Sequence, residues 1–425
     1  MKAVLFIIYI AFFSLITSGQ VTYNDFFTNE SLRIDFILAG NSDEINLYWK
    51  KVKMENHWSG SRINLIDSLN RGSYIYELRD LDSKKLIYSS GFSSLFEEWQ
   101  YTKEAKHTNK YFEESINLPY LKKESILKIY ARNMDNSLYL LADTILNPAS
   151  YLIDKEVIKK INFQSIVRNG SPNDKIDIAF LAEGYTIDEM EKFKNDVNRL
   201  KNYMFNTYPF NKYKNRFNIW LINLISEDSG TDNPRNNIWK STALNTSFYT
   251  FNSERYLTST DFFKIKDYAS VVPYDYIVIL VNTAKYGGGG IYNHFCVTVS
   301  DNEYSNFLFI HEFGHSFCGL ADEYYTSKVA FADLYEKPTE PWEPNITTLI
   351  DFDSKWKEMI ESGIPVPTPL TKQYKNVVGV FEGGGYAEKG IYRPYLNCIM
   401  KSKKAKNFCP VCAKNIEIKI LNESR

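Results

Sequence analysis

Two of the five histidines in this 425-residue chain stand four residues apart in the stretch HEFGHSFCGLADEYY, residues 311–325. Residues at this spacing share one face of an α-helix, so His311 and His315 can direct both imidazoles at one tetrahedral zinc ion. Glu312 follows the first histidine and can reach a water molecule held by that ion. The pattern predicts hydrolysis by activated water, with Glu312 as general base and then general acid.

The helix that must position these side chains is predicted over SNFLFIHEFGHSFCG, in which Ser305 can cap the start and Gly319 can end the helix in a left-handed conformation. Gly314 lies inside it, where glycine costs about 1 kcal/mol relative to alanine. Such a cost predicts the close approach of another group. After the helix, Asp322 and Glu323 each offer a carboxylate, and two histidines with one carboxylate leave the fourth zinc position open for water.

Two domains are predicted, because the pattern of apolar and polar residues changes along the chain. Residues 20–150 show short runs of alternating apolar and polar residues, which predict an antiparallel β-sandwich. Residues 151–425 differ: the stretch KIDIAFLAEGY, residues 175–185, reads as a strand buried on both faces. A helix follows, with Thr186 and Glu189 as a capping box. Further buried strands predict an α/β domain with a central sheet.

The first residues, MKAVLFIIYIAFFSLITSGQ, predict a signal peptide over 1–19 with cleavage before Gln20. We therefore expect an exported protein, extracellular or periplasmic, with no membrane span after cleavage. The net charge of −1 gives no overall attraction to nucleic acid.

These motifs resemble known proteases. HExxH, a glycine turn and a third ligand resemble the metzincins, although the turn is one residue longer here, and Met400 in NCIMKS resembles their methionine turn. With YRPYLNCIMKS, FCPVC, IAFLAEGYT and the segment 86–105, nearly the whole mature chain resembles the IgA peptidase family of zinc metalloendopeptidases. The resemblance implies a metzincin-like catalytic domain and one catalytic zinc ion. It also favours Asp322 as third ligand, with Glu323 as the alternative.

The resemblance also implies a protein or peptide substrate, with immunoglobulin A as a candidate. Two other functions stay open: a zinc amide hydrolase that acts on cell-wall peptide, and a non-catalytic secreted binding protein. The sequence leaves the cleavage preference and the oligomeric state open.

Substrate contacts are expected next to the zinc helix. The stretch GGGGIYNHFCVTVSDNEYSN, residues 287–306, predicts a glycine loop and then a strand around Phe295–Val299. In metzincin-like folds this strand lies at the sheet edge and pairs with an extended peptide. Tyr324 and Tyr325 are candidate oxyanion donors or core residues, and His294 is expected to be structural.

Two other groups are less specific. SEDSGTDNPR, residues 226–235, could hold calcium, but a polar turn is the favoured interpretation. The five cysteines all follow residue 295. Cys409 and Cys412 form a single CxxC, which favours a local disulfide or buried thiols at a helix start over structural zinc.

Overall fold

The computed structural model describes residues 21–156, 161–325 and 339–425. The predicted signal peptide, residues 1–19, lies outside these ranges. Among the described residues, no helix is both long and apolar enough to cross a membrane.

The first part of the chain forms two antiparallel sheets, with strand orders β2-β1-β5 and β4-β3-β6-β7. The strands and short helices are α1 (Tyr23–Phe26), β1 (Phe27–Gly40), β2 (Ile45–Glu55), β3 (Tyr74–Asp80), β4 (Leu86–Phe92), α2 (Leu95–Gln100), β5 (Lys110–Leu121), β6 (Ser125–Arg132) and β7 (Leu138–Leu146). In β6, SILKIYAR, every second residue is buried, as the alternation predicts. Phe36 of one sheet lies 6.3 Å from Phe92 of the other, ring centre to ring centre, so the two sheets share one core.

The second part is built on a six-stranded sheet of order β14-β15-β13-β9-β10-β8. Its strands are β8 (Asn162–Val167), β9 (Ile176–Glu183), β10 (Phe217–Asn223), β13 (Tyr276–Val281), β14 (Gly289–Ile291) and β15 (Phe295–Val299). The four central strands are parallel, and the outer strands β8 and β14 are antiparallel to their neighbours. Every residue of β9 and β13 is buried, which explains why these strands read as continuous apolar runs. The predicted mixed α/β region after the antiparallel sheets is confirmed.

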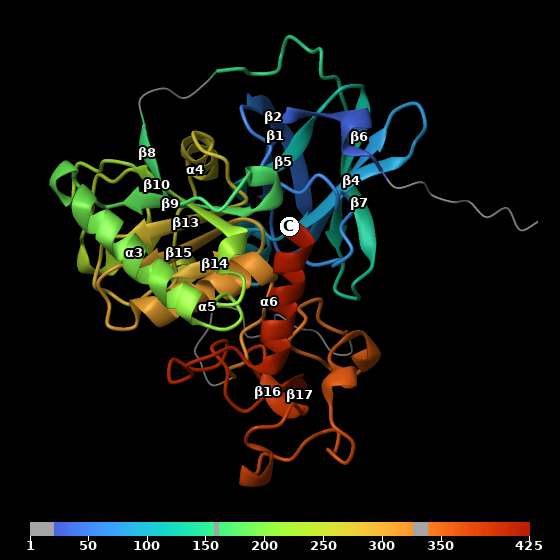
Figure 1. Ribbon diagram of the computed structural model, residues 1–425, viewed down its shortest axis with the longest axis vertical. Helices are drawn as coiled ribbons and strands as arrows, with labels where there is room; N and C mark the ends of the chain where they lie inside the picture. Colours follow the sequence, from blue (N-terminus) through green and yellow to red (C-terminus); the bar gives the residue numbers. More distant parts are fainter. Residues whose placement is uncertain (1–20, 157–160, 326–338) are drawn as a thin grey trace, which may run out of the picture.

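Helices cover both faces of this sheet. Helices α3 (Met190–Asn206) and α5 (Ser305–Cys318) contact each other on one face, and α5 packs on β14 and β15. Helix α4 (Phe262–Ala269) lies on the other face, where it contacts both β9 and β5 of the first part (Figure 1). The capping box of Thr186 and Glu189 is present, at the 3-10 turn that opens α3.

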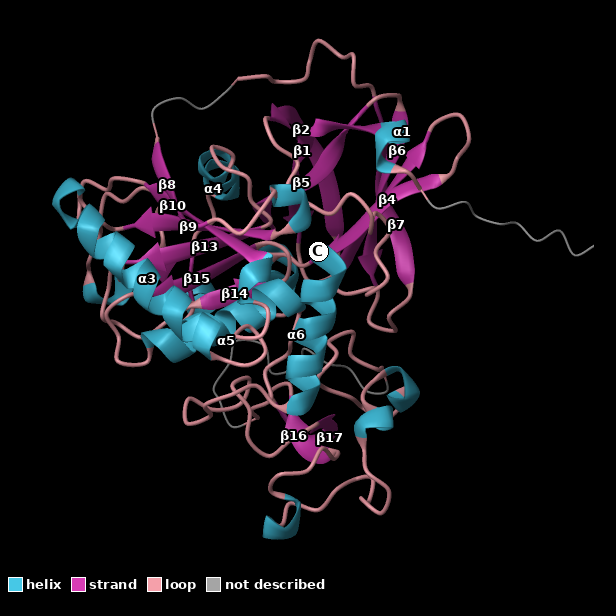
Figure 2. Ribbon diagram, in the orientation of Figure 1, coloured by secondary structure: helices cyan, strands magenta, loops and turns pink. Residues whose placement is uncertain are grey.

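The last part of the chain lies below the sheet and then returns. It consists largely of turns and contains the small strand pair β16 (Phe381–Gly384) and β17 (Ala387–Arg393). Helix α6 (Pro410–Glu423) then runs back toward the antiparallel sheets (Figure 2). Arg71 of the first part donates a hydrogen bond of 2.5 Å to Asn415 of α6. The C-terminal helix therefore connects the two parts.

Two details of the prediction are wrong. Ser305 is the first helical residue and Tyr304 occupies the cap position; the Ser305 hydroxyl instead accepts a hydrogen bond from Arg199. Strand β15 is not the sheet edge, because the glycines expected as a loop form β14 outside it. Glycine permits this short strand because its backbone can approach α5 closely: a Cβ atom on Gly290 would lie 2.1 Å from the carbonyl oxygen of Glu312.

Candidate metal centre

The two histidines of α5 point at a common position. Nδ1 of His311 lies 3.1 Å from the carbonyl oxygen of Ile399, and Nδ1 of His315 lies 2.5 Å from that of Leu320. These backbone partners fix both rings. The two Nε2 atoms are 3.3 Å apart, and the ring planes are nearly perpendicular, at 89°.

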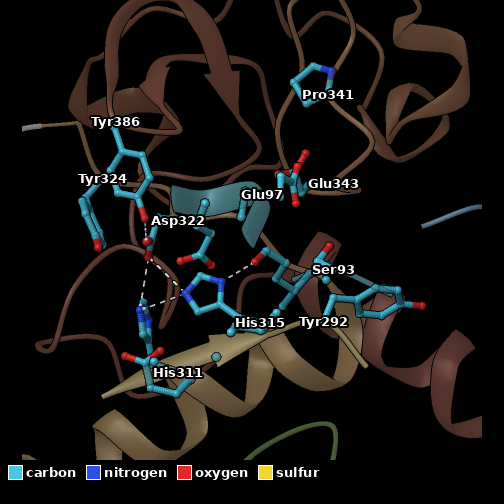
Figure 3. Close-up of a pocket in the computed structure, with 18 of the residues that line it drawn as sticks. Ser93, Glu97, Tyr292, His311, His315, Asp322, Tyr324, Pro341, Glu343 and Tyr386 are labelled. Carbon is cyan, nitrogen blue, oxygen red and sulfur yellow. Dashed lines mark hydrogen bonds and ion pairs between the residues drawn. The ribbon is translucent and has the colours of Figure 1, made fainter. Parts of the chain in front are cut away.

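A carboxylate completes the group. Helix α5 ends at Cys318, and the φ of 64° at the following Gly319 is the predicted left-handed conformation. The chain then turns back and places Asp322 beside both imidazoles (Figure 3). Oδ1 of Asp322 lies 3.2 Å from Nε2 of His311 and 3.4 Å from Nε2 of His315. The structure thus brings together His311, His315 and Asp322. The carboxylate of Glu323 points elsewhere, toward cysteines.

This arrangement suits a bound cation. Both Nδ1 atoms face carbonyl oxygens and must carry the ring proton there, which leaves a lone pair on each Nε2. Oδ1 of Asp322 is buried and has no hydrogen-bond donor. Three electron-pair donors therefore face one another, an arrangement that a metal ion stabilises. The Asp322 carboxylate also favours positive charge at this position. Burial would lower the pKa of His315, but the carboxylate outweighs it and, without a metal ion, raises this pKa to about 9. A metal ion bound at Nε2 would replace that proton.

Glu312 lies next to this group and against the edge strand. A Cβ atom on Gly288 would lie 3.1 Å from Cγ of Glu312, so the glycine backbone packs directly on the glutamate side chain. Burial raises the pKa of Glu312, while the two nearby imidazoles lower it. The net effect is a raised pKa, which makes the carboxylate a better proton acceptor, as a general base must be.

Met400 lies beneath the helix. The residue is fully buried, and a Cβ atom on Gly314 would lie 2.9 Å from its Sδ. The close approach predicted from the mid-helix glycine is present, and the sulfur of Met400 is the approaching atom.

The group stands in a cleft of about 520 Å³. One wall is the edge strand, including Gly289 and Gly290, and another comes from the antiparallel sheets through Glu97 and Glu98 of the short helix α2. Burial raises the pKa of Glu97 to about 8 and that of Glu98 to about 7. The first part of the chain therefore contributes directly to the surface that a substrate would meet.

Tyrosines line the other side of the cleft. The Tyr386 hydroxyl donates a hydrogen bond to Oδ2 of Asp322, and Tyr324 stacks on His311 with ring centres 6.5 Å apart (Figure 3). Arg255 donates a 3.2 Å hydrogen bond to the Tyr324 hydroxyl.

Of the predicted oxyanion candidates, Tyr324 faces the cleft, whereas Tyr325 packs against Gly383. Sequence reasoning missed Tyr386 and Arg255, which come from distant turns without a motif.

Two further groups have the structural roles that the sequence favours. His294 is buried, stacks on Phe262 and lies 3.1 Å from a carboxylate oxygen of Glu114. In the segment 226–235, Asp228 and Asp232 accept backbone hydrogen bonds from Ser241 and Lys240. These bonds are those of a polar turn, the interpretation that the sequence favours.

Two imidazoles, a carboxylate and an adjacent glutamate, gathered in a cleft beside a sheet edge, are the side chains of a metallohydrolase. The family model described as IgA Peptidase M64 matches residues 165–376 and 371–420, and that described as Peptidase M64 N-terminus matches residues 22–141. The chain belongs to the IgA peptidase M64 family and is therefore a peptidase. No curated protein shows a significant match to it.

Proposed function

We propose that the protein is an exported zinc-dependent endopeptidase with a metzincin-like catalytic domain. The observation that carries this proposal is the convergence of Nε2 of His311, Nε2 of His315 and Oδ1 of Asp322 within 3.4 Å of one another. Two imidazoles and one carboxylate form the three-ligand set of a catalytic zinc site with an open position. When bound, zinc would supply Lewis acidity toward a carbonyl oxygen and acidify a water molecule.

The roles of the protein groups follow from their positions. Glu312 takes a proton from the attacking water and returns it to the leaving amine. The Tyr386 hydroxyl orients the carboxylate of Asp322 through its hydrogen bond. Tyr324 faces the cleft and can donate a hydrogen bond to an oxygen that gains negative charge.

The substrate would bind as an extended peptide along β14. This strand ends the six-stranded sheet next to Glu312, and Gly288, Gly289 and Gly290 line the cleft. Backbone pairing with a sheet edge holds a peptide without strong demands on its side chains.

Immunoglobulin A is the first candidate substrate, because the family takes its description from it. A cell-wall peptide amide would meet the same catalytic groups. Oδ1 of Asp322 is buried without a hydrogen-bond partner among the residues that the structure describes. This disfavours a purely binding role, because a binding protein has no use for a buried set of metal ligands.

The test is cleavage by purified mature protein, with Glu312→Ala as the matched inactive variant. Immunoglobulin A, unrelated proteins and cell-wall peptides would be offered in parallel, and the new termini read by mass spectrometry. Cleavage of peptide bonds by the wild type alone is the expected result. Cleavage confined to the immunoglobulin hinge would fix the substrate as well.

Other outcomes change the conclusion in distinct ways. Cleavage of many proteins would keep the peptidase and remove immunoglobulin A as its specific substrate. Release of cell-wall fragments only would favour the amide hydrolase. Equal cleavage by Glu312→Ala would mean that these residues do not perform the reaction.

A further inference from the structure

A second cluster of possible metal ligands lies behind the catalytic group. It consists of Glu323, Cys398, Cys409 and Cys412, whose ligand atoms all lie within 4.8 Å of one another. All four residues are buried. They come from three separate segments: the turn after α5, the stretch before Met400, and the first turn of α6.

Among the described residues, no cation lies within ion-pair distance of the Glu323 carboxylate, although the charge of Arg393 acts on it. Its Oε1 lies 3.1 Å from Sγ of Cys412 and 3.9 Å from Sγ of Cys409, and accepts a 3.1 Å hydrogen bond from Asn345. Its Oε2 is buried with no hydrogen-bond partner, and within the described ranges no ion pair involves this residue. Burying a carboxylate in this way is costly unless a cation or a donor compensates it.

Two of the three sulfur atoms accept backbone hydrogen bonds. Cys409 caps the start of α6, and its Sγ accepts the backbone N–H of Cys412 at 3.5 Å. Sγ of Cys398 accepts the N–H of Cys409 at 3.2 Å. Backbone N–H groups and a helix N-terminus both stabilise negative charge on sulfur.

The spacing fits tetrahedral zinc. Zinc–oxygen bonds of about 2.0 Å and zinc–sulfur bonds of about 2.3 Å place an oxygen and a sulfur ligand about 3.5 Å apart at the tetrahedral angle. The distances from Oε1 of Glu323 to the two sulfurs, 3.1 and 3.9 Å, bracket that value. Three thiolates and one carboxylate fill the four positions and leave none for water, as in structural sites.

We propose that Glu323, Cys398, Cys409 and Cys412 bind a second, structural zinc ion. A disulfide, the interpretation that the single CxxC favours, accounts less well for the cluster. Any one bond would leave the third sulfur unpaired and would leave the buried Glu323 carboxylate with Asn345 as a side-chain donor but with no cation from the part of the chain that the structure describes. The five cysteines are free thiols in the structure. This proposal does not depend on which substrate the catalytic group cleaves.

Binding of this second ion would stabilise the positions of the catalytic ligands. Glu323 directly follows Asp322, and its N–H donates a 2.8 Å hydrogen bond to the carbonyl oxygen of Met400. Cys398 directly precedes Ile399, whose carbonyl oxygen lies 3.1 Å from Nδ1 of His311. A metal that fixes Glu323 and Cys398 therefore fixes the backbone on which two catalytic ligands depend.

The experiment measures zinc per chain in the full mature protein. His315→Ala removes a catalytic ligand and leaves every cysteine intact, so it should keep one zinc ion while wild type holds one more. Cys409→Ser/Cys412→Ser should lose the structural ion. Cys296→Ser, which removes a buried thiol of β15 outside the cluster, is the matched control and should bind as wild type does.

Because the cysteine variant could lose zinc by misfolding, a spectroscopic measurement tests the same site with all cysteines intact. Cobalt-loaded His315→Ala should show a thiolate-to-cobalt charge-transfer band in the near ultraviolet, with no cysteine altered. Absence of that band would overturn the proposal, as would a disulfide between two of the three cysteines in unreduced peptide maps of the wild type. If the peptidase proposal fails but the band is present, the structural site stands on its own.

Discussion

The sulfur of Met400 lies so close to Gly314 that a Cβ atom on the glycine would be 2.9 Å away. Met400 is fully buried, and Phe408 and Leu320 lie 3.4 and 3.5 Å from the same Cβ position. The helix that carries the two histidines therefore rests on a methionine that only a glycine can accommodate without rearrangement.

Gly314→Ala should destabilise the protein through this contact. Alanine gains about 1 kcal/mol of helix propensity, whereas overpacking a core costs about 1–3 kcal/mol. We expect a net loss in the free energy of unfolding of up to about 2 kcal/mol, measured by denaturant titration. The loss should shrink when Met400→Ala is combined with it, and additive effects of the two substitutions would contradict the contact.

Glu312→Gln should abolish chemistry but not metal binding. The amide keeps the size of the carboxylate and cannot accept the proton of the attacking water, so kcat/KM should fall about 100- to 10,000-fold. Zinc content, measured on the same preparation, should equal that of wild type. Loss of zinc from this variant would instead make Glu312 a ligand.

Tyr386→Phe should weaken the metal site without removing a ligand. The hydroxyl that it deletes donates a hydrogen bond to Asp322, and loss of such a partner typically costs about 10- to 100-fold in metal affinity or activity. Zinc affinity would be measured by competition with a chelator. Tyr325→Phe is the control, because that ring packs against Gly383 outside the cleft, and it should bind zinc as wild type does.

Arg71→Ala should weaken the contact between the two parts of the chain and destabilise the protein. The guanidinium donates to the carbonyl oxygen of Cys318 at 2.9 Å and to Asn415 at 2.5 Å, so one side chain of the first part joins both α5 and α6. Buried hydrogen bonds of a charged group are worth about 1.5–3 kcal/mol. We expect a loss of that size in the free energy of unfolding, measured by denaturant titration.

The control for this change is Arg79→Ala. Arg79 is partly exposed and pairs with Glu77 of the same strand, and such surface pairs contribute about 0–1 kcal/mol. Equal effects of the two substitutions would show that Arg71 does not stabilise the junction.

Local features were predictable because neighbours in sequence determine them. The spacing of His311 and His315 fixes a shared helix face, the left-handed turn at Gly319 follows from its lack of a side chain, and the apolar run of β9 follows from burial on both faces. Alternation in β6 identified the antiparallel sheets for the same reason. These are relationships over a few residues, and the fold class and the catalytic motif both depend on them.

Contacts between segments far apart in the sequence were decided only by the tertiary structure. Whether Asp322 or Glu323 faces the histidines depends on how the turn after α5 packs, and sequence alone left both carboxylates open. Which strand forms the sheet edge, and which cysteines meet Glu323, depend on contacts between segments far apart in the chain. The sequence determined the residues able to bind a metal and activate a water molecule. Long-range packing decided which of them meet, because pairing and burial are set by the whole fold and not by spacing along the chain.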